Sequence, residues 1–116
     1  MDTEFVKCDV RDHVALVTMD RPPVNAVNTQ VHEEIMRVFD TLSDREDVRV
    51  AILTGAGKVF CAGADIKARV EREPQAGDFW QHSRRAREAF HSILECRVPV
   101  IAAINGPALG AGLAIV

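Results

Sequence analysis

The chain has 116 residues, of which 47% are hydrophobic and 27% are charged, and its formal net charge at pH 7 is −3. This composition suits one folded domain and excludes a chain that is disordered by composition. Because no basic block or run of aromatic residues is present, no nucleic-acid surface is expected, and a small molecule or a protein is the expected partner.

The first third of the chain is predicted to form a hairpin followed by a helix. Residues 5–10 alternate between apolar and polar, as a half-buried strand does, and residues 13–19 are its predicted partner across a turn at 11–12. The prolines at 22 and 23 cannot donate to a sheet, so the chain leaves the sheet there. A cap at Asn28 or Thr29 then precedes apolar residues at helical spacing, namely Val31, Ile35, Val38, Phe39 and Leu42.

The middle of the chain is predicted to contain a strand, a loop and a second helix. Residues 48–54 form the strand, which ends at the glycines of 55–57. Residues 68–77 are charged and contain Pro74 and Gly77, which predicts a mobile surface segment. Asp78 and Gln81 resemble a capping box at the start of an amphipathic helix that ends near residue 96.

The end of the chain is predicted to contain a buried strand at 98–104, a turn at 105–107 and a helix that opens near 109–112. The order β-β-α-β-loop-α-β-α favours an α/β fold. Residues 98–116 carry no charge, but Pro99 and the turn interrupt them, so no membrane span is expected. The chain stops within an apolar helical pattern, which predicts a truncated fold.

Cysteine and histidine spacing predicts neither a disulfide framework nor a metal site. The three cysteines, at 8, 61 and 96, are widely spaced and odd in number, which favours a reducing, cytoplasmic location. The N-terminal residues lack the basic and apolar character of a signal peptide. No ligand spacing relates the four histidines, which are His13, His32, His82 and His91.

Two loops place small residues where a predicted strand meets a helix, at 61–65 and at 106–112. Small side chains let a ligand approach the main chain, and free N–H groups at a helix start favour negative charge. Two such N–H groups that point to one place form an oxyanion hole. Neither loop has the spacing of a P-loop or of a GxGxxG motif. The alternative is that both loops are only tight turns with close helix packing.

Three segments resemble motifs of the crotonase (enoyl-CoA hydratase/isomerase) superfamily, in that family's order and spacing. They are DRPPVNAV at 20–27, FCAGADIK at 60–67 and INGPALGAGLA at 104–114. The resemblance extends over essentially the whole chain, but over only roughly the first half of a typical member. It implies a spiral of ββα units, the ClpP/crotonase fold, with residues 1–116 as the N-terminal part of the core domain. It also implies a homo-oligomer, either a trimer or a dimer of trimers.

The same resemblance implies an acyl-CoA substrate and a set of site residues. Coenzyme A is then part of the substrate, and no permanently bound cofactor is expected. The backbone N–H groups of Ala64 and Ala111 are implied to bind the thioester oxygen and stabilise an enolate. The residues implied to line the nucleotide and pantetheine are Asn25, Ala26 and Val27. Those implied to contact the adenine, mainly through backbone atoms, are Ala62, Asp65 and Ile66. Lys67 is expected either near a phosphate of the coenzyme or in solvent.

The resemblance departs from the hydratase pattern at Ala114, where hydratases of this superfamily carry their first glutamate. Their second glutamate lies beyond residue 116. Isomerase or other single-acid chemistry is therefore expected beside hydration, and a non-catalytic acyl-CoA-binding protein is the alternative. Cys61 is expected to be a small buried residue rather than a nucleophile. Glu71 and Glu73 are catalytic candidates, although a solvated charged face is the favoured interpretation.

Overall fold

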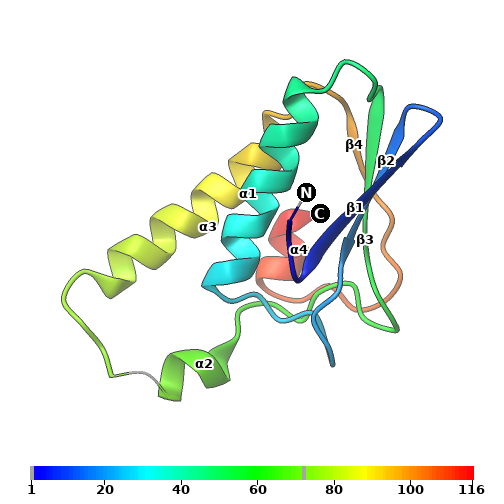
Figure 1. Ribbon diagram of the computed structural model, residues 1–116. Helices are drawn as coiled ribbons and strands as arrows, with labels where there is room; N and C mark the ends of the chain where they lie inside the picture. The colour runs from blue at the N-terminus through cyan, green and yellow to red at the C-terminus, as the bar shows by residue number, and fades with distance from the viewer. Residues whose placement is uncertain (1, 72) are drawn as a thin grey trace.

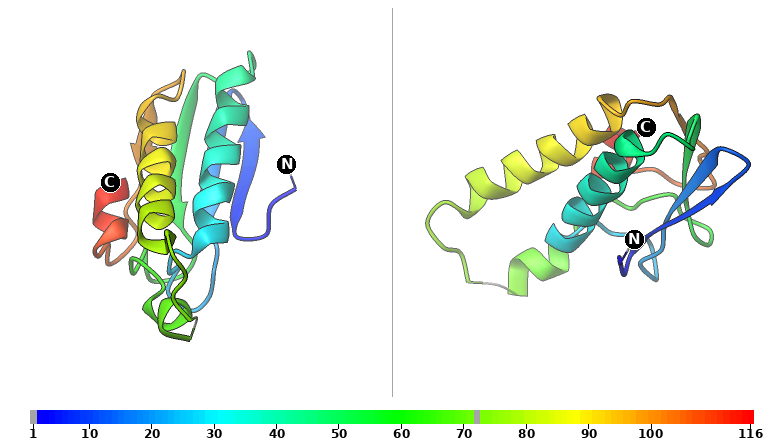
Figure 2. Two further views of the ribbon diagram at one scale, coloured as in Figure 1. Left: turned by 90° about the vertical axis from the view of Figure 1, so that its left-hand side faces the viewer. Right: turned by 45° about the horizontal axis from the view of Figure 1, so that its top comes forward.

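The fold is described from a computed structural model, which describes residues 2–71 and 73–116. The strands are β1 (Val6–Arg11), β2 (Val14–Met19), β3 (Val50–Gly55) and β4 (Val100–Ala102), and the helices are α1 (Thr29–Asp44), α2 (Ile66–Glu71), α3 (Asp78–Leu94) and α4 (Ala111–Ile115). The sheet order is β1-β2-β3-β4, with β1 antiparallel to β2 and the other pairs parallel. Figure 1 shows α1, α3 and α4 on one side of this sheet, and Figure 2 shows the same layers from two further directions. The predicted α/β class is confirmed.

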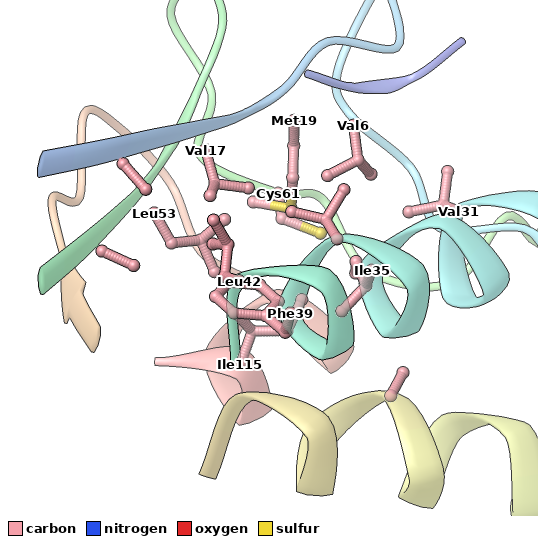
Figure 3. Packing of buried hydrophobic residues seen from close by; sticks show 14 of the residues in the cluster. Val6, Val17, Met19, Val31, Ile35, Phe39, Leu42, Leu53, Cys61 and Ile115 are labelled. Carbon is pink, nitrogen blue, oxygen red and sulfur yellow. The ribbon is translucent and has the colours of Figure 1, made fainter. Parts of the chain in front are cut away.

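The core lies between the sheet and α1. Alternate strand residues, such as Val17 and Leu53, point to the helices, where they meet the apolar face of α1 (Figure 3). Phe39 and Leu42 of this helix are fully buried. Asn28 caps α1 by accepting a hydrogen bond from the Val31 N–H at 2.9 Å. Of the two caps that the sequence allowed, Asn28 and Thr29, the structure thus has Asn28.

The hairpin turn lies one residue further along the chain than predicted. Arg11 pairs with Val14, so Asp12 and His13 form a two-residue turn. Their φ angles are 50° and 70°. Two consecutive residues with positive φ match the twist of the flanking strands, because such turns have the same handedness as the sheet.

Two sequence predictions about the second half of the chain are wrong, and a third stays a prediction. The segment predicted as mobile at 68–77 begins inside helix α2, its residue 72 lies outside the described residues, and its mobility stays a prediction. The cap of α3 is Gly77, with φ of 86° and no side-chain bond, while Asp78 accepts a bond from the Gln75 N–H at 2.7 Å. The buried strand at 98–104 is only Val100–Ala102, and Ile101 is 55% exposed because nothing described here covers the outer face of the sheet.

A buried carboxylate attaches the N-terminal segment to α1. Glu34 is 5% exposed, and its Oε1 accepts bonds from the N–H groups of Glu4, Phe5 and Val6 at 2.7–3.0 Å. Burial alone would raise the pKa of this carboxyl, but bonds from Gln30 and from the three N–H groups lower it below its usual value. One acidic side chain therefore attaches the start of β1 to α1, in addition to the pairing of β1 with β2.

Replacing Glu34 by alanine is expected to lower the free energy of unfolding by about 3 kcal/mol, because three N–H groups lose a charged acceptor. Denaturant titration of the full-length protein measures this change. The exposed Glu46 is the matched control, since its replacement by alanine is expected to change stability by less than about 0.5 kcal/mol. Equal effects at both positions would contradict the role of Glu34.

Candidate functional site

The two small-residue loops of the sequence lie side by side. Cys61 and Ala108 form a parallel bridge. The N–H groups of Phe60 and Cys61 donate to the Pro107 oxygen at 3.1 and 3.2 Å, and the Leu109 N–H donates to the Cys61 oxygen at 3.0 Å. Backbone bonds therefore join segments that are distant in the sequence, one before α2 and one before α4.

Glycines bring these loops closer than side chains allow. A Cβ at Gly63 would lie 2.8 Å from the Leu109 oxygen and 3.5 Å from the Ala111 nitrogen. A Cβ at Gly112 would lie 2.2 Å from the Cys61 oxygen. Real Cβ atoms do not approach backbone oxygen so closely, so glycine at both positions sets the distance between the loops.

The N–H groups of Ala64 and Ala111 stand at this junction. Ala64 forms a parallel bridge with Val27, but its own N–H makes neither bond of this bridge. The Val27 N–H donates to the Gly63 oxygen at 2.7 Å, and the Asp65 N–H donates to the Val27 oxygen at 2.9 Å. Because backbone groups alternate along an extended segment, the Ala64 N–H points to the opposite side. Within the described residues, neither the Ala64 nor the Ala111 N–H has a protein acceptor.

The segments predicted to contact coenzyme A are also neighbours. The Ala62 N–H donates to the Val24 oxygen at 3.1 Å, so residues 24–27 lie along residues 62–65. Val27 is 2% exposed, whereas Ile66 is 69% exposed, and Lys67 is exposed. The structure therefore gathers these residues at one place, and their contacts with the coenzyme stay a prediction.

The Asp65 carboxylate is already bound within the protein. Its Oδ2 lies 2.7 Å from Nη2 of Arg21, and its Oδ1 accepts the Ala68 N–H of α2 at 3.0 Å. The Ala68 N–H and then Arg21 lower the pKa of this carboxyl below its usual value. Arg21 also donates to the Ala26 oxygen at 2.9 Å. This pair connects the DRPP segment to the first loop. Because the Asp65 N–H donates to the Val27 oxygen, the Asp65 carbonyl is the group that remains for a ligand.

The other catalytic candidates of the sequence are placed less favourably. Cys61 is fully buried, and burial raises the pKa of its thiol despite a bond from the Gly63 N–H. Ala114 is an exposed residue of α4 and has no group that can transfer a proton. Glu73 is exposed, and the side chain of Glu71 lies outside the described residues. No acid or base among the described residues is thus assigned to proton transfer.

The sequence did not predict a cavity of about 790 Å³ between α1, α2 and α3. Val27 and Asp65, which flank Ala64, form part of its wall, and Phe79, His82 and Arg85 of α3 form another part. The cavity therefore adjoins the end of the first loop, at Asp65. Its α3 residues come from a helix whose angle to α1 no sequence pattern specifies.

The described residues contain no group of three or more side chains able to hold a metal ion. No helix in that part of the chain is both long enough and apolar enough to cross a bilayer.

The comparisons with known proteins agree with the loop geometry. The family model described as Enoyl-CoA hydratase/isomerase matches residues 9–116. The chain belongs to the enoyl-CoA hydratase/isomerase family. It is 37% identical over 109 residues to Enoyl-CoA hydratase EchA19 of Mycobacterium tuberculosis, and this match covers 90% of the chain and 40% of that protein. It is 40% identical over 103 residues to Carnitinyl-CoA dehydratase of Proteus mirabilis, with 88% of the chain and 38% of that protein covered.

Solved structures of this family share the fold. The Enoyl-CoA hydratase of Bacillus anthracis superposes with a TM-score of 0.88 and 31% identity, over 97% of this chain and 44% of that one. An enoyl-CoA hydratase/isomerase of Mycobacterium paratuberculosis superposes with a TM-score of 0.87 and 32% identity, over 99% of this chain and 47% of that one. The predicted crotonase-like fold is therefore confirmed. The chain spans about 40% of the length of the first curated relatives.

Cys61 is expected to be the last of the three cysteines to react with iodoacetamide at pH 8, because its thiol is fully buried with a raised pKa. Cys8 and Cys96 are partly exposed. Mass spectrometry of the native protein, alkylated for increasing times, measures the order of labelling. If Cys61 is labelled first, it is an accessible thiol and the assignment to the core is wrong.

Proposed function

We propose that this chain supplies the thioester-binding part of an acyl-CoA enzyme of the enoyl-CoA hydratase/isomerase type. The N–H groups of Ala64 and Ala111 bind the thioester carbonyl oxygen. They stabilise the enolate that forms when a proton leaves the α-carbon or when water adds to the β-carbon of an enoyl thioester, and protonation of the α-carbon then consumes this enolate. The observation that carries this proposal is the pair of N–H groups on two loops that glycines hold together, for which the described part of the chain offers no acceptor. Such donors act where negative charge develops during the reaction.

Coenzyme A enters as part of the substrate, along residues 24–27 and 62–67. Backbone groups of Ala62, Asp65 and Ile66 contact the adenine, since the Asp65 carboxylate is committed to Arg21. Lys67 is exposed and supplies a positive charge for a phosphate. The names of the relatives above agree with a CoA thioester as the substrate class.

Ala114 limits the reaction. An alanine cannot act as general acid or base, so a two-glutamate hydration has no support within these residues. One acid or base elsewhere in the protein is sufficient to move a double bond. Isomerisation or another single-acid reaction is therefore proposed beside hydration. The same residue favours a second candidate function, acyl-CoA binding without turnover.

The test uses the full-length protein with crotonyl-CoA, a 3-enoyl-CoA and butyryl-CoA as a saturated thioester. Binding of butyryl-CoA, together with turnover of either unsaturated thioester, supports the enzyme. Binding of all three without turnover supports the second candidate. If none binds at millimolar concentration, both are wrong. Sedimentation of the same protein tests the proposed trimer or dimer of trimers, and cell fractionation tests the proposed cytoplasmic location.

A further inference from the structure

Two asparagines hold the segment that leads from β3 into the first loop. Residues 56–60 follow the end of β3, so their carbonyl groups have no strand partner. Four of these five carbonyl oxygens, those of Ala56, Gly57, Val59 and Phe60, accept bonds from the amides of Asn25 or Asn105. Side-chain amides thus replace the sheet as the partners of this segment.

Asn25 holds this segment from the side of the DRPP motif. It is 4% exposed and has a positive φ of 55°, a conformation that asparagine adopts more readily than most residues. Its Nδ2 lies 3.1 Å from the Ala56 oxygen, 2.9 Å from that of Val59 and 3.3 Å from that of Phe60. Its Oδ1 accepts the Arg21 N–H at 2.9 Å. All polar atoms of the side chain are engaged in protein contacts.

Asn105 holds the same segment from the opposite direction. It immediately precedes the second loop, and its Nδ2 donates to the oxygens of Gly57 and Val59 at 2.9 and 3.3 Å. Its Oδ1 accepts the Gly55 N–H at 3.1 Å. Asn105 is exposed, so water competes for its bonds, and each is weaker than those of Asn25.

The two amides meet at one atom. The Val59 oxygen accepts from both Asn25 and Asn105. After Val59, hydrogen bonds of Phe60, Cys61 and Leu109 join the two loops. This series of bonds ends where Gly63 approaches Ala111. The amides of the two asparagines hold its first end, and they therefore fix the distance between the loops at its second end.

We infer that Asn25 and Asn105 are positioning residues that set the separation of the Ala64 and Ala111 N–H groups. This inference rests on the proposed function, since those groups need a thioester oxygen to act on. Neither asparagine touches the oxyanion. Each acts through the segment 56–60, and displacement of a donor by about 1 Å is enough to lose about 100-fold in rate.

The first measurement needs no ligand. Hydrogen exchange of the Phe60 and Cys61 amides in the full-length protein is expected to quicken about fivefold or more in Asn105→Ala, because the bonds of both to Pro107 open more often. The exposed position of Asn105 means that this variant is expected to fold. We call Asn25 and Asn105, with the segment 56–60 that they bind, the clamp. Unchanged exchange at these amides would show that the clamp does not hold the two loops together.

The second measurement follows the thioester itself, with butyryl-CoA labelled at its carbonyl carbon with ¹³C. Hydrogen bonds from an oxyanion hole polarise the carbonyl and lower its infrared stretching frequency. Asn105→Ala is expected to reduce this shift while Kd changes by less than about threefold, and to reduce kcat on a reactive thioester by about 10-fold. Asn25→Ala, if it folds, is expected to reduce both the shift and kcat further. A full shift in folded Asn105→Ala would overturn the inference.

Asn28→Ala is the matched control. Asn28 is the remaining asparagine of the chain. Its side chain caps α1 through the Val31 N–H, so its loss costs about 1 kcal/mol of stability. The carbonyl shift and the exchange at Phe60 and Cys61 are expected to stay at wild-type values. A reduced shift in this variant would show that lost stability alone produces the effect, which would contradict positioning. If the wild-type protein does not bind butyryl-CoA, the proposed function and the positioning role both fail, while the exchange data still report on the clamp.

Discussion

Replacing Gly112 by alanine is expected to lower the free energy of unfolding by about 3 kcal/mol and to abolish binding of butyryl-CoA. The new Cβ would lie 2.2 Å from the Cys61 oxygen and 2.9 Å from the Cys61 carbonyl carbon. Both atoms belong to the backbone of a buried residue, so neither can rotate away. The start of α4 must therefore retreat from the first loop, and the neighbouring Ala111 N–H moves with it.

Gly77→Ala is the matched control for this change. Gly77 is the N-cap of α3 and has a positive φ of 86°, but a Cβ there meets nothing within 4 Å. Its replacement is expected to cost about 1 kcal/mol through backbone strain alone, with binding unchanged. Denaturant titration and calorimetric binding of butyryl-CoA measure both variants. If Gly112→Ala is no worse than Gly77→Ala, close contact of the loops is not what positions Ala111.

The sequence predicted the local features of this fold well. Alternation identified the residues of β1 and β2, and helical spacing identified the buried face of α1, because each pattern depends on neighbouring residues only. The glycines at 63, 106, 110 and 112 marked the two loops. A Cβ at Gly106 would lie 2.0 Å from the Lys58 oxygen, which explains why a glycine pattern carried information about contact between distant segments.

Features that depend on tertiary contacts were not predicted. Helix α2, which includes the start of the charged segment 68–77, was not predicted. Asp65 caps this helix through the Ala68 N–H while also pairing with Arg21. Nothing local shows that an aspartate has a partner forty or more positions away. The clamp formed by Asn25 and Asn105 was missed for the same reason, since a lone asparagine in a turn normally indicates only the turn.

A buried histidine was also missed, although its position on α1 was predicted correctly. His32 is 2% exposed, and neither of its ring nitrogens has a hydrogen-bond partner among the residues that the structure describes. Its ring centroid lies 5.6 Å from that of His82 and 6.4 Å from that of Phe90, both on α3. A histidine at a buried helical position is thus accommodated in its neutral form between two helices.

The protein is expected to lose about 3 kcal/mol of stability as the pH falls from 6.5 to 4, and His32 is the cause. Burial, then His82 and then Arg85, lower the pKa of His32 from 6.5 to about 4. The unfolded chain therefore binds a proton at a pH where the folded protein does not, and a pKa difference of this size corresponds to about 3 kcal/mol. Arg85 also forms an ion pair with Glu33, with Nε and Oε1 3.7 Å apart.

This pH range separates His32 from the carboxylates. The pKa values of Glu34 and Asp65 are lowered, so their contributions are present above their unfolded pKa values and are lost only below about pH 4.5. Denaturant titration of His32→Leu between pH 8 and pH 5 is expected to show little pH dependence, with stability at pH 8 equal to or above wild type, because leucine leaves no unpaired polar atom in the core. Replacing the exposed His91 by glutamine is expected to leave the wild-type slope unchanged. A full slope in His32→Leu would assign the effect to another group that titrates in this pH range.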